Sequence, residues 1–186
     1  MNRNRFGMWI TLASIFMLFA GLVAAYAFAL ARQGLWRPVK IPPQMWAGSV
    51  ALLFSSILLE LARRYLRRAM FHTYRKLLWA AFALGCLFLV CQSLAWVNLA
   101  VQGVFMKGNP HGSMWYAFTG FHAAHLAGGM IAMVMLLIGA GKLNADHGEP
   151  PLRRHRSFAM VTAMYWHFMG VLWAALFGLL NYWNQA

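Results

Sequence analysis

Five long apolar segments constrain this chain more than any other feature of its sequence. Crossing the hydrocarbon core of a bilayer takes about 20 mostly apolar residues in a helix. The segments cover residues 8–30, 45–62, 77–101, 114–140 and 158–183. Spanning segments of this kind must be helical, because a bilayer interior offers backbone groups no water. The connections are too short for a soluble domain, so the sequence predicts an all-α polytopic membrane protein, a single transmembrane domain of five helices over residues 1–186.

The charge of the chain indicates its topology. Sixteen Lys and Arg against three acids give a formal charge of +13, which in a soluble protein would suggest nucleic acid. Here 62% of the residues are hydrophobic and the bases lie between the apolar segments, so we expect no nucleic-acid partner. Alternating the connections places twelve bases on the side of the N-terminus and four on the other. Because bases concentrate on the cytoplasmic side, we expect the N-terminus in the cytoplasm and the C-terminus on the outer, periplasmic side.

The densest run of bases, "LARRYLRRAMFHTYRK", is predicted to continue the second helix past the membrane surface. Arg63, Arg64, Arg67 and Arg68 are candidate contacts for anionic lipid headgroups, each worth about 1 kcal/mol near such a surface. Alternatively, these arginines serve only as a topology signal, or they bind a partner protein. Glu60 precedes Arg63 and Arg64 by three and four residues, a spacing at which side chains meet on one helix face. We therefore expect Glu60 to be an ion-paired acid near the cytoplasmic interface, not a proton carrier.

Polar side chains at membrane depth are costly unless they find partners, which makes them the first candidates for function. With Glu60 assigned to the interface, the apolar segments contain no carboxylate. This weakens the hypothesis of a small ion-coupled transporter. The candidate buried polar cluster consists of His122, His125, His167, Gln92, Thr119 and Tyr165.

The histidines of this cluster leave several hypotheses open. His122 and His125, in "TGFHAAHLAGG", lie about 60° apart on a helix surface, and His167, in "YWHFMG", approaches them if the two helices are neighbours. Facing histidines hold a b-type haem, and three imidazoles suit zinc or copper, so a membrane cytochrome or copper protein is one alternative. Hydrogen bonds to groups on other helices, worth about 1 kcal/mol each, are the interpretation that we favour.

Small residues recur every four positions on two predicted helices. We interpret each row as a stripe along which another backbone comes close. The first stripe holds Gly120, Ala124, Gly128 and Ala132, and the second holds Gly170, Ala174 and Gly178. Aromatic residues toward the predicted membrane boundaries, Trp115 and Tyr116 among them, are interpreted as interfacial anchors.

Two paired motifs, "GSMWYAFTGFHAAHLAGG" and "YWHFMGVLWAALFGLLNYW", resemble subunit III of haem–copper terminal oxidases. Three earlier segments agree in order: "LASIFMLFAGLVAAY", "LLFSSILLELARRYLRRA" and "LGCLFLVCQSLAW". The resemblance to the short five-helix bacterial form therefore covers nearly the whole chain.

This resemblance implies an accessory subunit of a respiratory cytochrome c oxidase, multi-pass in the bacterial inner membrane. It implies no cofactor in this chain, with haem and copper in the partner catalytic subunits. It further implies direct packing against subunit I, contact with other oxidase subunits, bound phospholipid, and a role in assembly, proton supply and sustained turnover. Accessory subunits of quinol oxidase and nitric oxide reductase, from the same superfamily, are the nearest alternatives.

The chain lacks three carboxylates of the family pattern. Ile15 stands where the family has Glu in "LASEVMLFAG", Ala95 where Glu precedes the third-helix Trp, and Gly170 where Asp follows "YWHFV". A proton-related role of those acids therefore cannot be carried over. The histidines of the fourth helix need hydroxyl, amide, carbonyl or water partners instead. The expected protein partners are Gln92, Thr119 and Tyr165.

Overall fold

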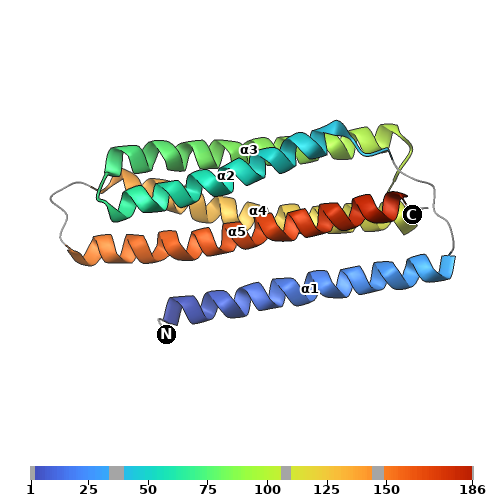
Figure 1. Ribbon diagram of the computed structural model, residues 1–186, viewed down its shortest axis with the longest axis horizontal. Helices are drawn as coiled ribbons and strands as arrows, with labels where there is room; N and C mark the ends of the chain where they lie inside the picture. Colours follow the sequence, from blue (N-terminus) through green and yellow to red (C-terminus); the bar gives the residue numbers. More distant parts are fainter. Residues whose placement is uncertain (1–2, 34–39, 106–109, 144–148, 186) are drawn as a thin grey trace.

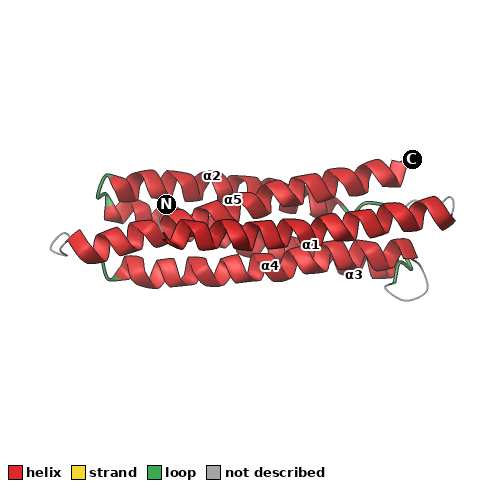
Figure 2. Ribbon diagram, turned by 90° about the horizontal axis from the view of Figure 1, so that it is seen from below, coloured by secondary structure: helices red, strands yellow, loops and turns green. Residues whose placement is uncertain are grey.

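The computed structural model describes residues 3–33, 40–105, 110–143 and 149–185, which contain helices and no strand (Figures 1 and 2). The helices are α1 (Arg3–Gln33), α2 (Pro43–Arg67), α3 (Phe71–Val101), α4 (Pro110–Gly141) and α5 (Glu149–Gln185). Each predicted apolar segment lies within one of them, and all 5 are long and apolar enough to cross a membrane. The prediction of an all-helical protein with five membrane-spanning helices is confirmed.

The helices extend beyond the apolar segments, because hydropathy marks only the part inside the hydrocarbon. The largest difference is at α5, which begins at Glu149 although "GKLNADHGEPP" predicts a loop through Pro151. Pro150 and Pro151 lie in the first turn, where backbone N–H groups have no partner within the helix, so proline is tolerated there. The loop prediction is therefore wrong for residues 149–151, and residues 144–148 lie outside the described part of the chain.

The turn between α2 and α3 corrects a second prediction. The run "LARRYLRRAMFHTYRK" continues the second helix only as far as Arg67, because α2 ends there and α3 begins at Phe71. Ala69 adopts a left-handed φ of 57°, and the Met70 N–H donates to the Tyr65 carbonyl oxygen at 3.0 Å. This bond is the one that closes a helix C-terminus in a Schellman motif. The chain turns back at once, so bases of both helices lie together.

Helices α2, α3, α4 and α5 form a bundle in which each packs beside two of the others, with α2 and α3 in the most extensive contact. Helix α1 lies outside this bundle, against α5 and α4 (Figure 1). Tyr26 of α1 is fully buried, with its ring centroid 5.8 Å from that of Phe118 and 4.4 Å from that of Trp183. Aromatic contacts therefore hold α1 to the bundle.

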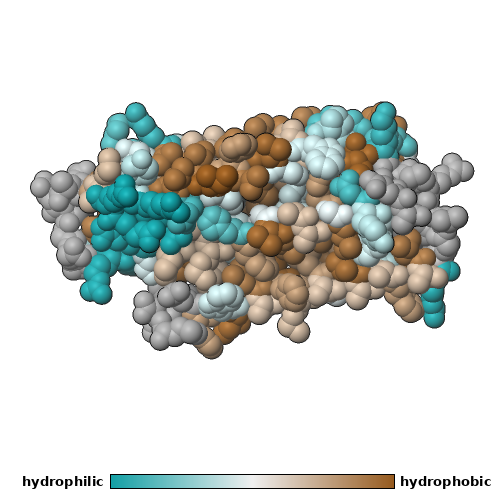
Figure 3. Space-filling model, in the orientation of Figure 1, coloured by the Kyte–Doolittle hydropathy of each residue, from teal (hydrophilic) through white to brown (hydrophobic). Residues whose placement is uncertain are grey.

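Two hydrogen-bonded contacts bring the basic segments to one end of the molecule. At the start of α3, Arg75 donates from Nε to the Ala140 carbonyl oxygen at 2.8 Å and from Nη2 to that of Leu143. These acceptors lie at the C-terminus of α4, where carbonyl groups lack partners within the helix. Arg156 of α5 donates to the Arg67 carbonyl oxygen at 3.3 Å. Hydrophilic surface gathers at this basic end, where α2 and α4 finish and α3 and α5 begin (Figure 3).

Candidate functional site

Trp166 of α5 joins three other helices at the centre of the bundle, where it is 0% exposed. Its Nε1 donates to Ser55 Oγ at 3.1 Å, and Ser55 Oγ donates to the Ala81 carbonyl oxygen at 2.7 Å. Gly85 of α3 and Gly129 of α4 flank the indole, since a β-carbon there would lie 3.1 Å and 3.0 Å from ring atoms. The ring therefore fits because both glycines lack a side chain.

Trp173, two turns further along α5, makes a second bond of this kind. Its Nε1 donates to Ser49 Oγ at 2.8 Å, and Ser49 Oγ donates to the Met45 carbonyl oxygen at 2.7 Å. A buried indole N–H needs an acceptor, and the two tryptophan–serine bonds fix the rotation of α5 against α2. This pair of bonds was not predicted from the sequence. A tryptophan inside one apolar segment and a serine inside another are the signal that was available.

A group of hydrogen bonds joins α3 to α4. Trp96 Nε1 donates to Thr119 Oγ1 at 2.9 Å, and the Thr119 hydroxyl donates to the Trp115 carbonyl oxygen at 2.7 Å. Tyr116 Oη donates to the Val104 carbonyl oxygen at 3.0 Å. Trp115 is 0% exposed, so its interpretation as an interfacial anchor is wrong. The position of Trp115 along the helix predicts only its depth in the membrane. The rotation of α4 about its axis directs the side chain into the core.

His122 lies in the interior of the bundle and is 0% exposed. Its ring centroid is 4.9 Å from that of Trp173 and 5.9 Å from that of Phe88. Within the described part of the chain, neither ring nitrogen has a hydrogen-bond partner, and the same holds for the side-chain amide of Gln92. The expected bond between His122 and Gln92 is therefore not formed, and aromatic packing holds the imidazole.

His125 has different neighbours from His122. Its Nδ1 lies 2.7 Å from the Phe121 carbonyl oxygen of its own helix, and its ring packs edge-on against Phe19 of α1. Tyr165 Oη donates to the backbone carbonyl oxygen of His125 at 2.7 Å. Of the expected partners, Tyr165 thus reaches the backbone of His125 instead of its ring. The Thr119 hydroxyl bonds to Trp96 and Trp115, as described above.

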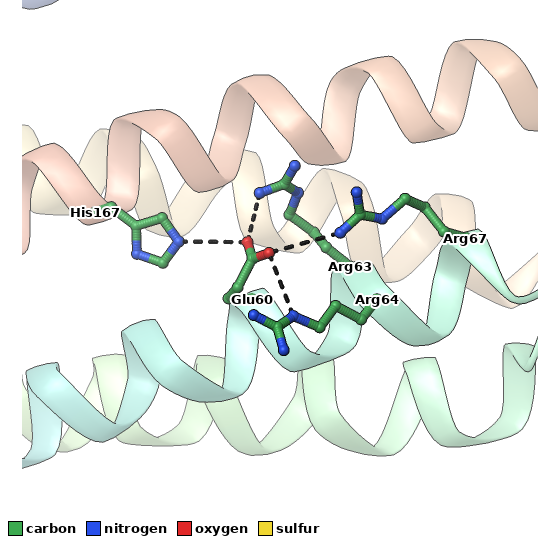
Figure 4. A network of polar contacts seen from close by, with 5 residues as sticks. All are labelled: Glu60, Arg63, Arg64, Arg67 and His167. Atoms are coloured by element: carbon green, nitrogen blue, oxygen red, sulfur yellow. Dashed lines mark hydrogen bonds and ion pairs between the residues drawn. The ribbon is translucent and has the colours of Figure 1, made fainter.

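His167 faces α2, where it meets an acid (Figure 4). Its Nε2 lies 3.8 Å from Oε2 of Glu60. Glu60 also pairs with Arg63 at 2.5 Å and with Arg64 and Arg67 at 3.8 Å each. The predicted pairing of Glu60 with Arg63 and Arg64 is confirmed. The contact with His167 was not foreseen, because it depends on which face of α5 is turned toward α2.

The described residues contain no group of three or more His, Cys, Asp or Glu side chains placed to hold a metal ion. The three intramembrane histidines have separate surroundings: aromatic rings at His122, a carbonyl oxygen at His125 and a carboxylate at His167. This geometry does not support the hypothesis that the three act together as haem or copper ligands.

Apolar residues occupy the three positions at which the family resemblance leads us to expect carboxylates. Ile15 is 6% exposed and Ala95 is 0% exposed, and both belong to the hydrophobic core. Gly170 faces α2, where a β-carbon would lie 3.4 Å from Ser56 Oγ. An acid at either core position would be expensive to bury. One carboxylate–histidine contact is nevertheless present, because Glu60 reaches His167 from α2.

A groove of about 740 Å³ lies between α2 and α5. Gly170, Ala174 and Gly178 form part of its α5 wall, while Leu53 and Ser56 contribute to its α2 wall. A β-carbon on Gly178 would meet nothing within 4 Å. The prediction that this stripe brings two backbones together is therefore wrong. Its small residues leave an apolar space because the facing side chains do not fill it.

The stripe on α4 gives the same result. A β-carbon on Gly120 would meet nothing within 4 Å, and one on Gly128 would meet only Tyr165 Oη, at 3.8 Å. The close approach on α4 is made by Gly129, one position away from the predicted stripe. A shift of one residue turns a side chain by about 100°, so the correct kind of residue was expected on the wrong face.

The chain as a whole matches a known family. A profile of the family described as cytochrome c oxidase subunit III matches residues 1–185. The chain belongs to the cytochrome c oxidase subunit III family. The identification made from the paired motifs of α4 and α5 is thereby confirmed.

Relatives from several bacteria are similar over nearly the full length. A probable cytochrome c oxidase subunit 3 of Mycobacterium tuberculosis is 28% identical over 185 residues, covering 97% of this chain and 88% of the relative. The cytochrome c oxidase subunit 3 of Corynebacterium diphtheriae is 29% identical over 183 residues, or 95% and 86% of the two chains. A probable quinol oxidase subunit 3 of Staphylococcus epidermidis is 27% identical over 184 residues, or 94% and 86%.

Membership of this family indicates where the protein is located and with which proteins it assembles. The chain is a multi-pass protein of the bacterial inner membrane and a subunit of a respiratory haem–copper oxidase complex, with other oxidase subunits as partners. The two paired motifs contain residues that hydrogen-bond one helix to another: Thr119 in the α4 motif and Trp166 and Trp173 in the α5 motif. These three residues of the motifs thus connect helices to one another.

Proposed function

We propose that this chain is an accessory, cofactor-free subunit of a cytochrome c oxidase that packs directly against catalytic subunit I. In this proposal the haem and copper belong to the partner catalytic subunits, and the present chain supports their assembly, proton supply and sustained turnover. The observation that carries the proposal is the family match over residues 1–185. The structure adds support, because the motif residues join helices to one another.

The orientation and the lipid contacts form part of the same proposal. The basic end gathers the bases of α2, α3 and α5, so we place it in the cytoplasm and the C-terminus in the periplasm. The groove between α2 and α5 has a mostly apolar wall, which suits a phospholipid acyl chain. Arg63, Arg64, Arg67 and Arg68 follow at the basic end, where a headgroup of the same lipid leaflet would lie.

Proton supply by this chain cannot use the acids that it lacks at Ile15, Ala95 and Gly170. The pair formed by Glu60 and His167 is the carboxylate–imidazole contact that the described residues offer. It lies toward the basic end, on the side that we assign to the cytoplasm. Glu60 is held by Arg63, Arg64 and Arg67, so we propose that it is an ion-paired acid and that the chain supports proton supply through its packing, not as a proton carrier.

Affinity purification of the tagged full chain from native membranes tests the proposal. We expect mass spectrometry to find the catalytic subunit of a haem–copper oxidase in stoichiometric amount. Untagged membranes carried through the same column are the control for carry-over of abundant oxidases. Recovery of the chain without any oxidase subunit would count against the proposal.

A quinol oxidase is the second candidate, because one of the relatives bears that name. The electron donor is bound by other subunits, so this chain does not decide between the two. The purified complex should oxidise reduced cytochrome c if the first candidate is correct. Oxygen consumption with a quinol, and none with cytochrome c, would establish the second.

A further inference from the structure

A small cavity lies between the last turn of α2 and the first half of α5, apart from the groove described above. Its volume is about 280 Å³, and its polar lining consists of Arg63 and Arg67 from α2 and Arg156 and Ser157 from α5. Arg63, Arg67 and Arg156 thus border one space at the basic end of the bundle. The sequence does not show this grouping, because Arg156 is 89 residues from Arg67.

The charges around this cavity are not balanced. Of the described acids, Glu60 contacts the lining, and it pairs with Arg63 and Arg67. The same carboxylate also contacts Arg64 and His167. One described carboxylate, which Arg64 also shares, accompanies the three lining arginines, so positive charge is in excess around the cavity. Neighbouring cations repel one another, so an anion in this space would stabilise the arrangement.

Arg156 is held in place while part of its donor capacity stays unused. The Nη2 of Arg156 donates to the Arg67 carbonyl oxygen at 3.3 Å. This bond holds the guanidinium against the end of α2. Its Nε is buried and has no hydrogen-bond partner among the described residues. A buried donor without a partner costs about 1 to 3 kcal/mol, and more when it is charged.

We propose that Arg63, Arg67, Arg156 and Ser157 form a binding site for a phosphate group. The planar guanidinium donates two parallel N–H groups, which match a pair of phosphate oxygens. A hydroxyl beside three guanidinium groups supplies a further donor. The phosphate belongs either to an anionic phospholipid of the adjacent leaflet or to a soluble phosphate compound. Both sources present the same oxygens to the same donors.

This site deepens the proposed lipid contacts of Arg63 and Arg67 and adds two residues of α5 that the sequence did not single out. The site depends on the proposed function in one respect, which is the assignment of the chain to the bacterial inner membrane. Binding at the cavity is measured on this chain itself, whereas the accessory role is measured by recovery of oxidase subunits. The phosphate site can therefore be disproved without disproving the accessory role, and the accessory role without disproving the site.

The test compares two arginines of α5 that differ in position. Arg156→Gln removes a lining guanidinium, and Arg153→Gln removes the same charge from an exposed residue one turn earlier that does not line the cavity. The full chain is purified in detergent and titrated with phosphatidylglycerol, followed by native mass spectrometry. A parallel titration with inorganic phosphate is followed by calorimetry.

We expect Arg156→Gln to weaken binding about tenfold or more, as the loss of a charge-assisted hydrogen bond predicts, and Arg153→Gln to weaken it less than about twofold. Dependence on Arg156 with phosphatidylglycerol identifies a lipid as the source, and dependence with inorganic phosphate alone identifies a soluble compound. Equal effects of the two variants, or no binding of either probe, would overturn the site. If Arg156→Gln fails to fold, Arg156→Lys and Ser157→Ala replace it, and each should weaken binding about threefold or more while the Arg153 control does not.

Discussion

Small residues have two different uses around α5. Toward α3 and α4, Gly85 and Gly129 face the Trp166 ring so closely that a β-carbon would lie about 3 Å from it. Along the groove between α2 and α5, Gly170 and Gly178 lie where a β-carbon would meet one atom at 3.4 Å or nothing. We call the surroundings of Trp166 toward α3 and α4 the filled side, and the groove between α2 and α5 the open side.

This difference shows that the structural role of a glycine on a membrane helix depends on the side chain that faces it. Lipid tails are as apolar as a protein core, so close packing of the kind found around Trp166 is a main source of helix association. The open side contributes less to that packing and leaves surface for a lipid. We expect substitutions on the filled side to affect stability and those on the open side to affect lipid retention.

Trp166→Ala should have the largest effect, because it empties the filled side. Truncating a buried tryptophan costs about 3 to 5 kcal/mol, and Ser55 loses its donor as well. We expect a large loss of thermal stability of the purified chain, measured with a thiol-reactive dye that reports unfolding through the free Cys86 and Cys91. Trp166→Phe is the control that keeps much of the ring and should cost about half as much. Equal stability of Trp166→Ala and wild type would show that the filled side does not hold the bundle.

Gly129→Ala should come second. Its β-carbon would lie 3.0 Å from Trp166 and 3.1 Å from Tyr165, two rings with little freedom to move. Overpacking costs about 1 to 3 kcal/mol, reduced by up to about 1 kcal/mol from the better helix propensity of alanine. The matched control is Gly178→Ala, which has open space and should be neutral or slightly stabilising. The same thermal assay decides, and equal shifts in the two variants would remove the distinction between the two sides.

Glu60→Gln should have a smaller effect, at the end of the open side. It leaves Arg63, Arg64 and Arg67 without their shared carboxylate, and the Glu60 and Arg63 side chains are 30% and 21% exposed. Partly exposed pairs contribute about 1 kcal/mol or less, so we expect a loss of that size. High salt should reduce the difference from wild type, because it screens the remaining repulsion. A loss that stays the same at high salt would mean that packing, and not charge, is responsible.

His122→Leu should have the smallest effect of the four. Neither imidazole nitrogen has a partner among the described residues, so leucine removes unpaired polar atoms from a layer of aromatic rings. We expect stability to change by less than about 1 kcal/mol in either direction and the initial turnover rate of the purified oxidase to be unchanged. An immediate loss of turnover with the complex intact would show that His122 serves the oxidase reaction directly.

The predictions from sequence were correct where the properties of a single helix were sufficient. The five spans follow from hydropathy, and the pairing of Glu60 with Arg63 and Arg64 follows from their spacing on one helix. It failed where two helices had to be placed against each other. Trp115 was assigned to the membrane boundary and lies in the core, and the stripe on α4 was one position away from Gly129.

The sequence by itself determined that the chain consists of membrane-spanning helices with its bases collected between alternate spans, because a bilayer permits no other backbone arrangement for such segments. Only the tertiary structure decided that Trp166 reaches Ser55, that His167 meets Glu60 and that Arg156 joins Arg63 and Arg67 around one cavity. The reason is the rotation of each helix about its own axis. A helix that is apolar on all faces gives little indication of which face is inside, because lipid and protein interior are equally apolar.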